Sequence, residues 1–133
     1  MLFVLITIGF LLAGLIWPRL SEVKTGETPE YPEILPQLFS APSYRVFDAA
    51  AGAARELGWE VLREDRDGGE IDAIDRGLFG RRDEITIYVS AAASGKGESC
   101  TVNVHSRTRG GLNDFGSNAR RIQRFQKELA SRL

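Results

Sequence analysis

The side chains best suited to chemistry lie close together near the carboxyl end of the sequence. Arg109, Asp114, Asn118 and Arg121 fall where a strand-like stretch gives way to a helix-like one. A short oxygen-bearing side chain can accept hydrogen bonds from the free N–H groups at a helix start, so Asp114 or Asn113 is a candidate cap. Arginines beside a helix start can also hold a phosphate or carboxylate. The four residues therefore form either a structural cluster or an anion or partner contact.

Catalytic and metal-binding sets are missing from the sequence. His105 is the only histidine and Cys100 the only cysteine, too few for a zinc site or for a nucleophile with its base. On a regular strand Asp72 and Asp75 point to opposite faces, so they do not make a glycosidase pair. The sequence pI lies below neutrality and the basic helix face carries no interleaved aromatic residues, which argues against nucleic-acid binding. We therefore expect no enzymatic activity, no cofactor and no bound metal.

A short apolar pair stands out between these stretches. Leu78 and Phe79 are flanked by Gly77 and Gly80, a pattern typical of a loop. One reading is a plug beneath the helices. The other is an exposed apolar contact for a protein partner or a membrane surface.

Alternating strand-like and helix-like stretches must position these residues. Short or alternating apolar runs predict strands at 37–40, 59–63, 70–75, 85–89 and 101–106, with a hairpin turn at 65–69. Ser43 is a candidate N-cap and Gly58 a stop for a helix between the first two strands. Helical spacing marks two apolar stripes: Val46, Phe47, Ala50, Ala54 and Leu57, then Ala119, Ile122, Phe125, Leu129 and Leu133. The order β-α-β-β-β-β-α predicts an α+β fold, an antiparallel sheet of four to five strands with both amphipathic helices on one face.

The amino-terminal segment has a different character. Residues 1–17 contain no charged side chain, and a helix of that length, roughly 25 Å, is at the short end of what crosses a hydrocarbon core of about 30 Å. We expect a single transmembrane helix over residues 1–18, with Trp17 and Arg19 at the membrane interface. The alternative is a signal peptide, but no Lys or Arg precedes the apolar run and no small-residue cleavage site follows it. Arg19 and Lys24 favour a cytoplasmic domain by the positive-inside rule.

Composition divides the remainder into two parts. Residues 19–36 carry three prolines and four glutamates, which predicts an extended linker facing water, and residues 37–133 form the globular domain. Charge is sorted along the chain. Residues 22–75 contain 13 acidic and 5 basic side chains, whereas residues 107–133 contain 2 acidic and 7 basic ones. Either the basic helix lies near an acidic part of the same domain, or a partner neutralises both.

The last strand and helix also resemble the signature of a known family. That signature has alternating valines, a serine, a small hydroxyl residue, arginine and glycine, and then Asp-hydrophobic-Gly-x-Asn-Ala-x-Arg-Ile. Its positions are occupied here by Ser106, Thr108, Arg109, Gly111, Asp114, Gly116, Asn118, Ala119, Arg121 and Ile122. The family is called domain of unknown function 1499, and the resemblance covers roughly residues 31–133. It implies a shared fold and assigns no activity.

These observations favour a binding protein over an enzyme. We expect a membrane-anchored interaction module, an accessory or assembly subunit that docks on an integral membrane protein complex. The alternative is a tethered domain that binds a lipid or small ligand in a pocket between the sheet and the helices. The uncharged amino-terminal segment, the sorted charges and the missing catalytic set motivate the first reading.

Overall fold

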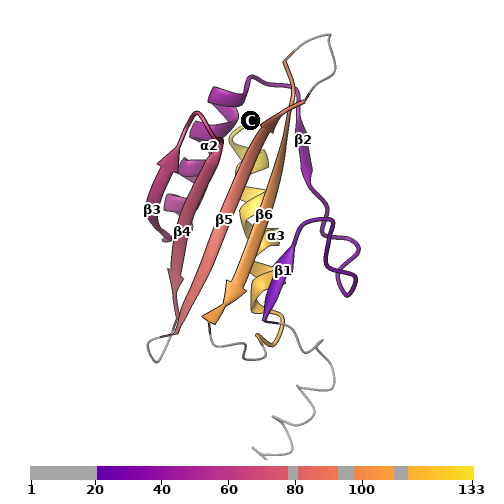
Figure 1. Ribbon diagram of the computed structural model, residues 1–133, viewed down its shortest axis with the longest axis vertical. Coiled ribbons are helices and arrows are strands. Elements are labelled where there is room, and N and C mark those ends of the chain that lie inside the picture. The colour runs from indigo at the N-terminus through magenta and orange to yellow at the C-terminus, as the bar shows by residue number, and fades with distance from the viewer. Residues whose placement is uncertain (1–20, 78–80, 93–97, 110–113) are drawn as a thin grey trace, which may run out of the picture.

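The described residues form one antiparallel sheet covered on one face by two helices (Figure 1). The computed structural model describes residues 21–77, 81–92, 98–109 and 114–133. The strands are β1 (Glu22–Lys24), β2 (Gln37–Phe39), β3 (Glu60–Asp65), β4 (Glu70–Arg76), β5 (Arg82–Ala91) and β6 (Cys100–Thr108), and the helices are α2 (Ser43–Glu56) and α3 (Ser117–Ser131). The sheet order is β1-β6-β5-β4-β3, and β2 also pairs with β6. The predicted α+β class and the antiparallel sheet are confirmed, with six strands instead of four or five.

The additional strand lies inside the segment predicted as a linker. β1 pairs with the end of β6, and Val23 and Ile34 are 0% and 1% exposed. The Thr25 N–H donates to the Val104 carbonyl at 3.0 Å, and the Gly26 N–H to the Ile34 carbonyl at 2.8 Å. The linker prediction is therefore wrong for the described part of residues 19–36. A few buried side chains fix this segment to the sheet while its glutamates remain in water.

The ends of α2 illustrate how local sequence sets an element. The N-cap is Pro42, one residue before the predicted cap, and Ser43 is the first residue of the helix and makes no side-chain capping bond. At the other end Gly58 adopts φ +82°, and its N–H and that of Trp59 return to carbonyls of the last helical turn. This is a Schellman motif, for which glycine is favoured since it carries no Cβ. The predicted stop at Gly58 is confirmed.

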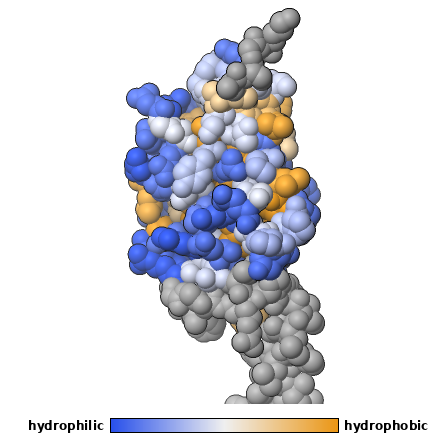
Figure 2. Space-filling view, turned by 45° about the vertical axis from the view of Figure 1, so that its right-hand side comes forward, coloured by the Kyte–Doolittle hydropathy of each residue, from blue (hydrophilic) through white to orange (hydrophobic). Residues whose placement is uncertain are grey.

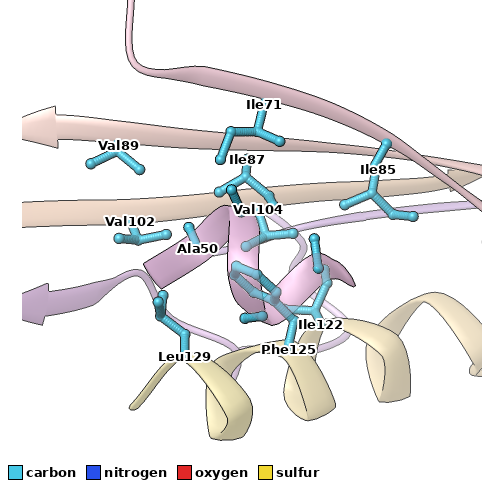
Figure 3. Close-up of a cluster of buried hydrophobic side chains, with 14 of the residues drawn as sticks. Ala50, Ile71, Ile85, Ile87, Val89, Val102, Val104, Ile122, Phe125 and Leu129 are labelled. Atoms are coloured by element: carbon cyan, nitrogen blue, oxygen red, sulfur yellow. The ribbon is translucent and has the colours of Figure 1, made fainter. Parts of the chain in front are cut away.

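The core lies between the inner face of the sheet and the two helices. Figure 3 shows side chains of β4, β5 and β6 meeting those of α2 and α3. Phe125 at the centre is 0% exposed and stacks on Trp59 with ring centroids 5.5 Å apart. Both predicted helical stripes face this core. The fully buried members include Val46, Ile71, Ile85, Ile87, Val102, Val104, Ile122 and Leu129.

The predicted membrane helix over residues 1–18, with Trp17 and Arg19 at its interface, lies outside the described residues. Leu78 and Phe79 also lie outside them. Neither of the two described helices has the length and apolar character needed to span a bilayer.

Candidate functional site

Polar side chains collect on the inner face of the sheet where it meets the start of α3. Alternation along β5 and β6 turns Asp83, Ser106 and Thr108 toward the helices, in line with the apolar residues of the same strands. All three are nearly buried, at 1%, 0% and 7% exposure. Asp75 lies directly opposite Asp83 in the register of β4 and β5. Two carboxylates therefore enter the domain side by side, and their charge requires a buried cation.

Arg121 supplies that cation from the second turn of α3. Its Nε donates to Asp75 Oδ2 at 2.8 Å and its Nη2 to Asp83 Oδ2 at 2.5 Å. Its Nη1 donates to Ser106 Oγ at 3.2 Å and to Asn118 Oδ1 at 2.8 Å. The planar guanidinium thus donates hydrogen bonds to side chains of strands β4, β5 and β6 and of its own helix. It fastens the helix to the sheet.

Asn118 and Asp114 continue this arrangement around the start of α3. Asp114 Oδ1 accepts the Gly116 N–H at 2.8 Å, and Asp114 Oδ2 accepts the Asn118 N–H at 3.4 Å. The N-cap of α3 is Gly116, so Asp114 is not the cap residue itself, but it accepts hydrogen bonds from N–H groups that the helix start leaves free. Asn118 Nδ2 donates to Asp114 Oδ2 at 2.8 Å, to Thr108 Oγ1 at 3.1 Å and to the Ser21 carbonyl at 3.1 Å.

Arg81, just before β5, completes the cluster at this end of the sheet. Its Nη2 donates to Thr108 Oγ1 at 3.1 Å and to Ser117 Oγ at 2.8 Å, while its Nε lies 3.3 Å from Asp83 Oδ1. We call the whole set the inner polar cluster; its members are Asp75, Arg81, Asp83, Ser106, Thr108, Asp114, Asn118 and Arg121. Each side chain in it has a partner within the domain. Such an arrangement specifies how α3 docks on the sheet.

The structure brings together three of the four candidate residues that the sequence singled out. Asp114, Asn118 and Arg121 are brought together, whereas Arg109 lies on the outer face of the sheet with its side chain 66% exposed. Asp75 and Asp83 were missed as members of the cluster. The available signal was an acidic residue at a core-facing position of an alternating strand, which is rare without a buried partner.

The outer face of the sheet has its own charged group at the same end. Glu84 Oε2 accepts from Arg107 Nε at 3.0 Å, and Glu84 Oε1 accepts from Arg109 Nε at 2.8 Å. The hydrogen bond from Arg107, followed by the charges of Arg107 and Arg109, lowers the pKa of the Glu84 carboxyl despite partial burial. The same hydrogen bond raises the pKa of Arg107. One glutamate is thus shared by two arginines.

A shallow groove of about 600 Å³ lies further along the outer face, beside β1. His105 lines it, and His105 Nε2 is 3.2 Å from Glu22 Oε2. Thr25 Oγ1 donates to Asn103 Oδ1 at 2.9 Å in the same region. Cys100 is buried on the inner face of the sheet, with its Sγ 3.1 Å from the Ala41 carbonyl and its pKa raised by burial. Within the described ranges, no group of three or more His, Cys, Asp or Glu side chains is placed to hold a metal ion.

Comparison with known proteins supports the resemblance seen in the sequence. A family model described as "Protein of unknown function (DUF1499)" matches residues 18–129. The match begins earlier than the sequence signature and so includes β1, consistent with that strand being part of the domain. No curated protein matches the chain.

Proposed function

The chain belongs to the DUF1499 family, and we propose that it is a membrane-anchored, non-enzymatic interaction module that docks on a larger membrane protein complex as an accessory or assembly subunit. The uncharged residues 1–17 support the anchor, since their length and composition suit a bilayer span. The anchor holds the domain at the membrane surface, where its partner is also found.

An exposed pair of leucines is the observation that carries the docking role. Leu35 is 58% exposed and Leu38 is 76% exposed. We call these two residues the leucine patch. Gln37, between them, donates through Nε2 to the Gln126 carbonyl at 2.9 Å, and Gln126 Nε2 donates to the Leu35 carbonyl at 2.7 Å. These two side-chain-to-backbone hydrogen bonds hold the segment of the leucine patch against α3, which lowers the conformational entropy lost when a partner covers the patch.

The surroundings of the leucine patch suit a protein partner. Figure 2 looks toward the side of the molecule that carries β1 and β2, and shows hydrophobic groups set in a largely hydrophilic surface. Apolar side chains rimmed by polar ones are typical of docking sites. Arg124 and Lys127 are exposed on α3 and form no ion pair with the other described residues. These cations add a site for acidic side chains of the partner.

The non-enzymatic part of the proposal is supported by the inner polar cluster. Arg121 and Asn118 are the residues that could have bound a substrate anion, and their donors are engaged by Asp75, Asp83, Asp114 and neighbouring oxygens. The alternative of a ligand pocket between sheet and helices gains no support, because side chains such as Phe125 fill that space with 0% exposure.

The leucine patch can be tested in the full-length protein. In mild detergent extracts of the native membrane, the wild-type chain should migrate on a native gel with a larger complex of fixed composition. Replacing Leu35 and Leu38 with glutamate should release it, with a loss of affinity of about tenfold or more, because charges would then face a desolvated contact. Leu62→Glu is the matched control, since Leu62 is 54% exposed on β3 at the opposite edge of the sheet. A wild-type chain that migrates alone, or equal release by Leu62→Glu, would contradict the proposal.

A further inference from the structure

Four arginines gather on the outer face of the sheet at one end. Arg76 and Arg82 lie directly opposite each other in the register of β4 and β5. Arg107 and Arg109, at the end of β6, both reach Glu84. We call these four residues the arginine cluster. The alternation of β5, in which Asp83 and Ile85 face the core, turns Arg82 to the same outer side as Glu84.

The arginine cluster carries more positive charge than its neighbours neutralise. Arg76 pairs with Glu60 at 2.9 Å, Glu84 is shared by Arg107 and Arg109, and Glu22 lies opposite Arg107 on β1, so three glutamates face four arginines. Arg82 has no ion pair among the described residues, and its buried Nε has no hydrogen-bond partner there. Like charges opposite each other across two strands destabilise a sheet, so the pair Arg76 and Arg82 favours an external anion between or beside them. The side chains of Arg76 and Arg109 are 61% and 66% exposed and can reach such an anion.

The beginning of the described chain lies beside this cluster. The Ser21 carbonyl accepts the Thr108 N–H at 2.7 Å and Asn118 Nδ2 at 3.1 Å, so Ser21 adjoins the residue between Arg107 and Arg109. Figure 1 shows β4, β6 and the start of β5 meeting at this end of the sheet, next to the start of β1. Only residues 18–20 separate Ser21 from Trp17. An extended chain advances at most about 3.6 Å per residue, which limits the step from Trp17 to Ser21 to about 14 Å.

From the charge excess and this short reach, we infer that the arginine cluster binds the headgroups of anionic phospholipids and seats the domain directly on the bilayer. The inference rests on the anchor assigned under the proposed function. Guanidinium groups suit phosphate because they donate two parallel hydrogen bonds to its oxygens. The domain then stands with its sheet end against the membrane, and the leucine patch on its side is presented to a neighbour in the same membrane.

Native mass spectrometry of the full chain in detergent micelles tests the headgroup contact, with phosphatidylglycerol and phosphatidylcholine as competing probes. The wild-type chain should retain phosphatidylglycerol preferentially. The double variant Arg82→Gln and Arg109→Gln should weaken that retention by about fivefold per arginine, the usual contribution of a basic side chain near an anionic surface. Replacement of the same two residues by lysine should keep most of the preference, because the charges remain.

The matched control removes two positive charges from the exposed side of α3. Arg124→Gln with Lys127→Gln should leave the preference for phosphatidylglycerol unchanged. Equal retention by the Arg82 and Arg109 variant, or an equal loss in the α3 variant, would overturn the inference. Displacement of the lipid by millimolar inorganic phosphate would also overturn it, because the site would then serve a soluble anion. Alkaline carbonate extraction of membranes checks the anchor separately: release of the wild-type chain would remove the proposed function, whatever the lipid preference.

Discussion

Arg121→Met should be among the most damaging single substitutions in the domain. The change removes the cation from Asp83, which is 1% exposed, and from Asp75, whose side chain is 25% exposed. Breaking a buried ion pair by removing one partner typically costs about 3–5 kcal/mol. Arg81 still lies 3.3 Å from Asp83, and Asp75 can turn to water, so we expect the lower end of that range, about 3 kcal/mol. That is a large part of the roughly 5–15 kcal/mol that stabilises an ordinary domain.

Urea unfolding of the full chain in detergent measures this loss. Trp59 is 5% exposed and stacked on Phe125, so its fluorescence reports the core, provided that Trp17 is replaced by phenylalanine in every variant. Arg124→Met serves as the control and should change the free energy of unfolding by less than about 0.5 kcal/mol. Adding Asp83→Asn to Arg121→Met should recover about 1–2 kcal/mol, since the uncompensated charge is gone. A loss below about 1 kcal/mol for Arg121→Met would refute the view that this residue fastens α3 to the sheet.

Four other residues, Gly69, Gly58, Cys100 and Glu84, can be tested one at a time. Gly69→Ala should cost at least about 2 kcal/mol in urea unfolding, because Gly69 has φ +70° and an added Cβ would meet a backbone oxygen at 2.1 Å. Gly58→Ala, where φ is +82° but the space is open, should cost only about 1–2 kcal/mol, and equal losses would contradict the steric reason. Cys100 should react with a thiol reagent only as fast as the domain opens, because the thiol is buried with a raised pKa; rapid labelling of the folded chain would count against its burial. The pKa of the Glu84 carboxyl is lower in the folded state than its ordinary value of 4.5. The ionised carboxylate should therefore stabilise the fold at pH values above 4.5, and this stabilisation should be lost as the pH falls through the lowered pKa of the folded state. Glu84→Gln should therefore cost up to about 1 kcal/mol at neutral pH and flatten the acid limb of a thermal-unfolding profile; an unchanged limb would count against the shift.

The helices and the long strands could be predicted because their signals are local. Apolar residues three and four apart define the buried faces of α2 and α3, and the alternation of Ile85, Ile87 and Val89 defines the inner face of β5. β1 was missed for an equally physical reason. It has three residues and is followed by prolines and glutamates, so its place in the sheet depends on the partner strand β6 and on the burial of Val23.

The candidate site was only partly accessible from sequence because it is assembled by register and docking. Arg121 meets Asp75 and Asp83 across separations of 46 and 38 residues, and no local pattern specifies those contacts. Arg109 was grouped with Arg121 because both lie near the start of α3 in the sequence. Arg109 instead donates to Glu84 on the outer face, so the two arginines lie on opposite faces of the sheet.

The pairing of β1 and β2 with β6 constrains the order in which the chain can mature during synthesis. Lys24 pairs with His105 and Gln37 with Val102, so both early strands remain without a neighbour until the ribosome has produced β6. At about 5–20 residues per second that interval lasts several seconds. During it the nascent amino-terminal strands expose unpaired backbone groups, a state in which a chaperone can capture them. Once the carboxyl-terminal helix has left the ribosome, its Asn118 can donate to the Ser21 carbonyl, and the domain is completed in a single late step.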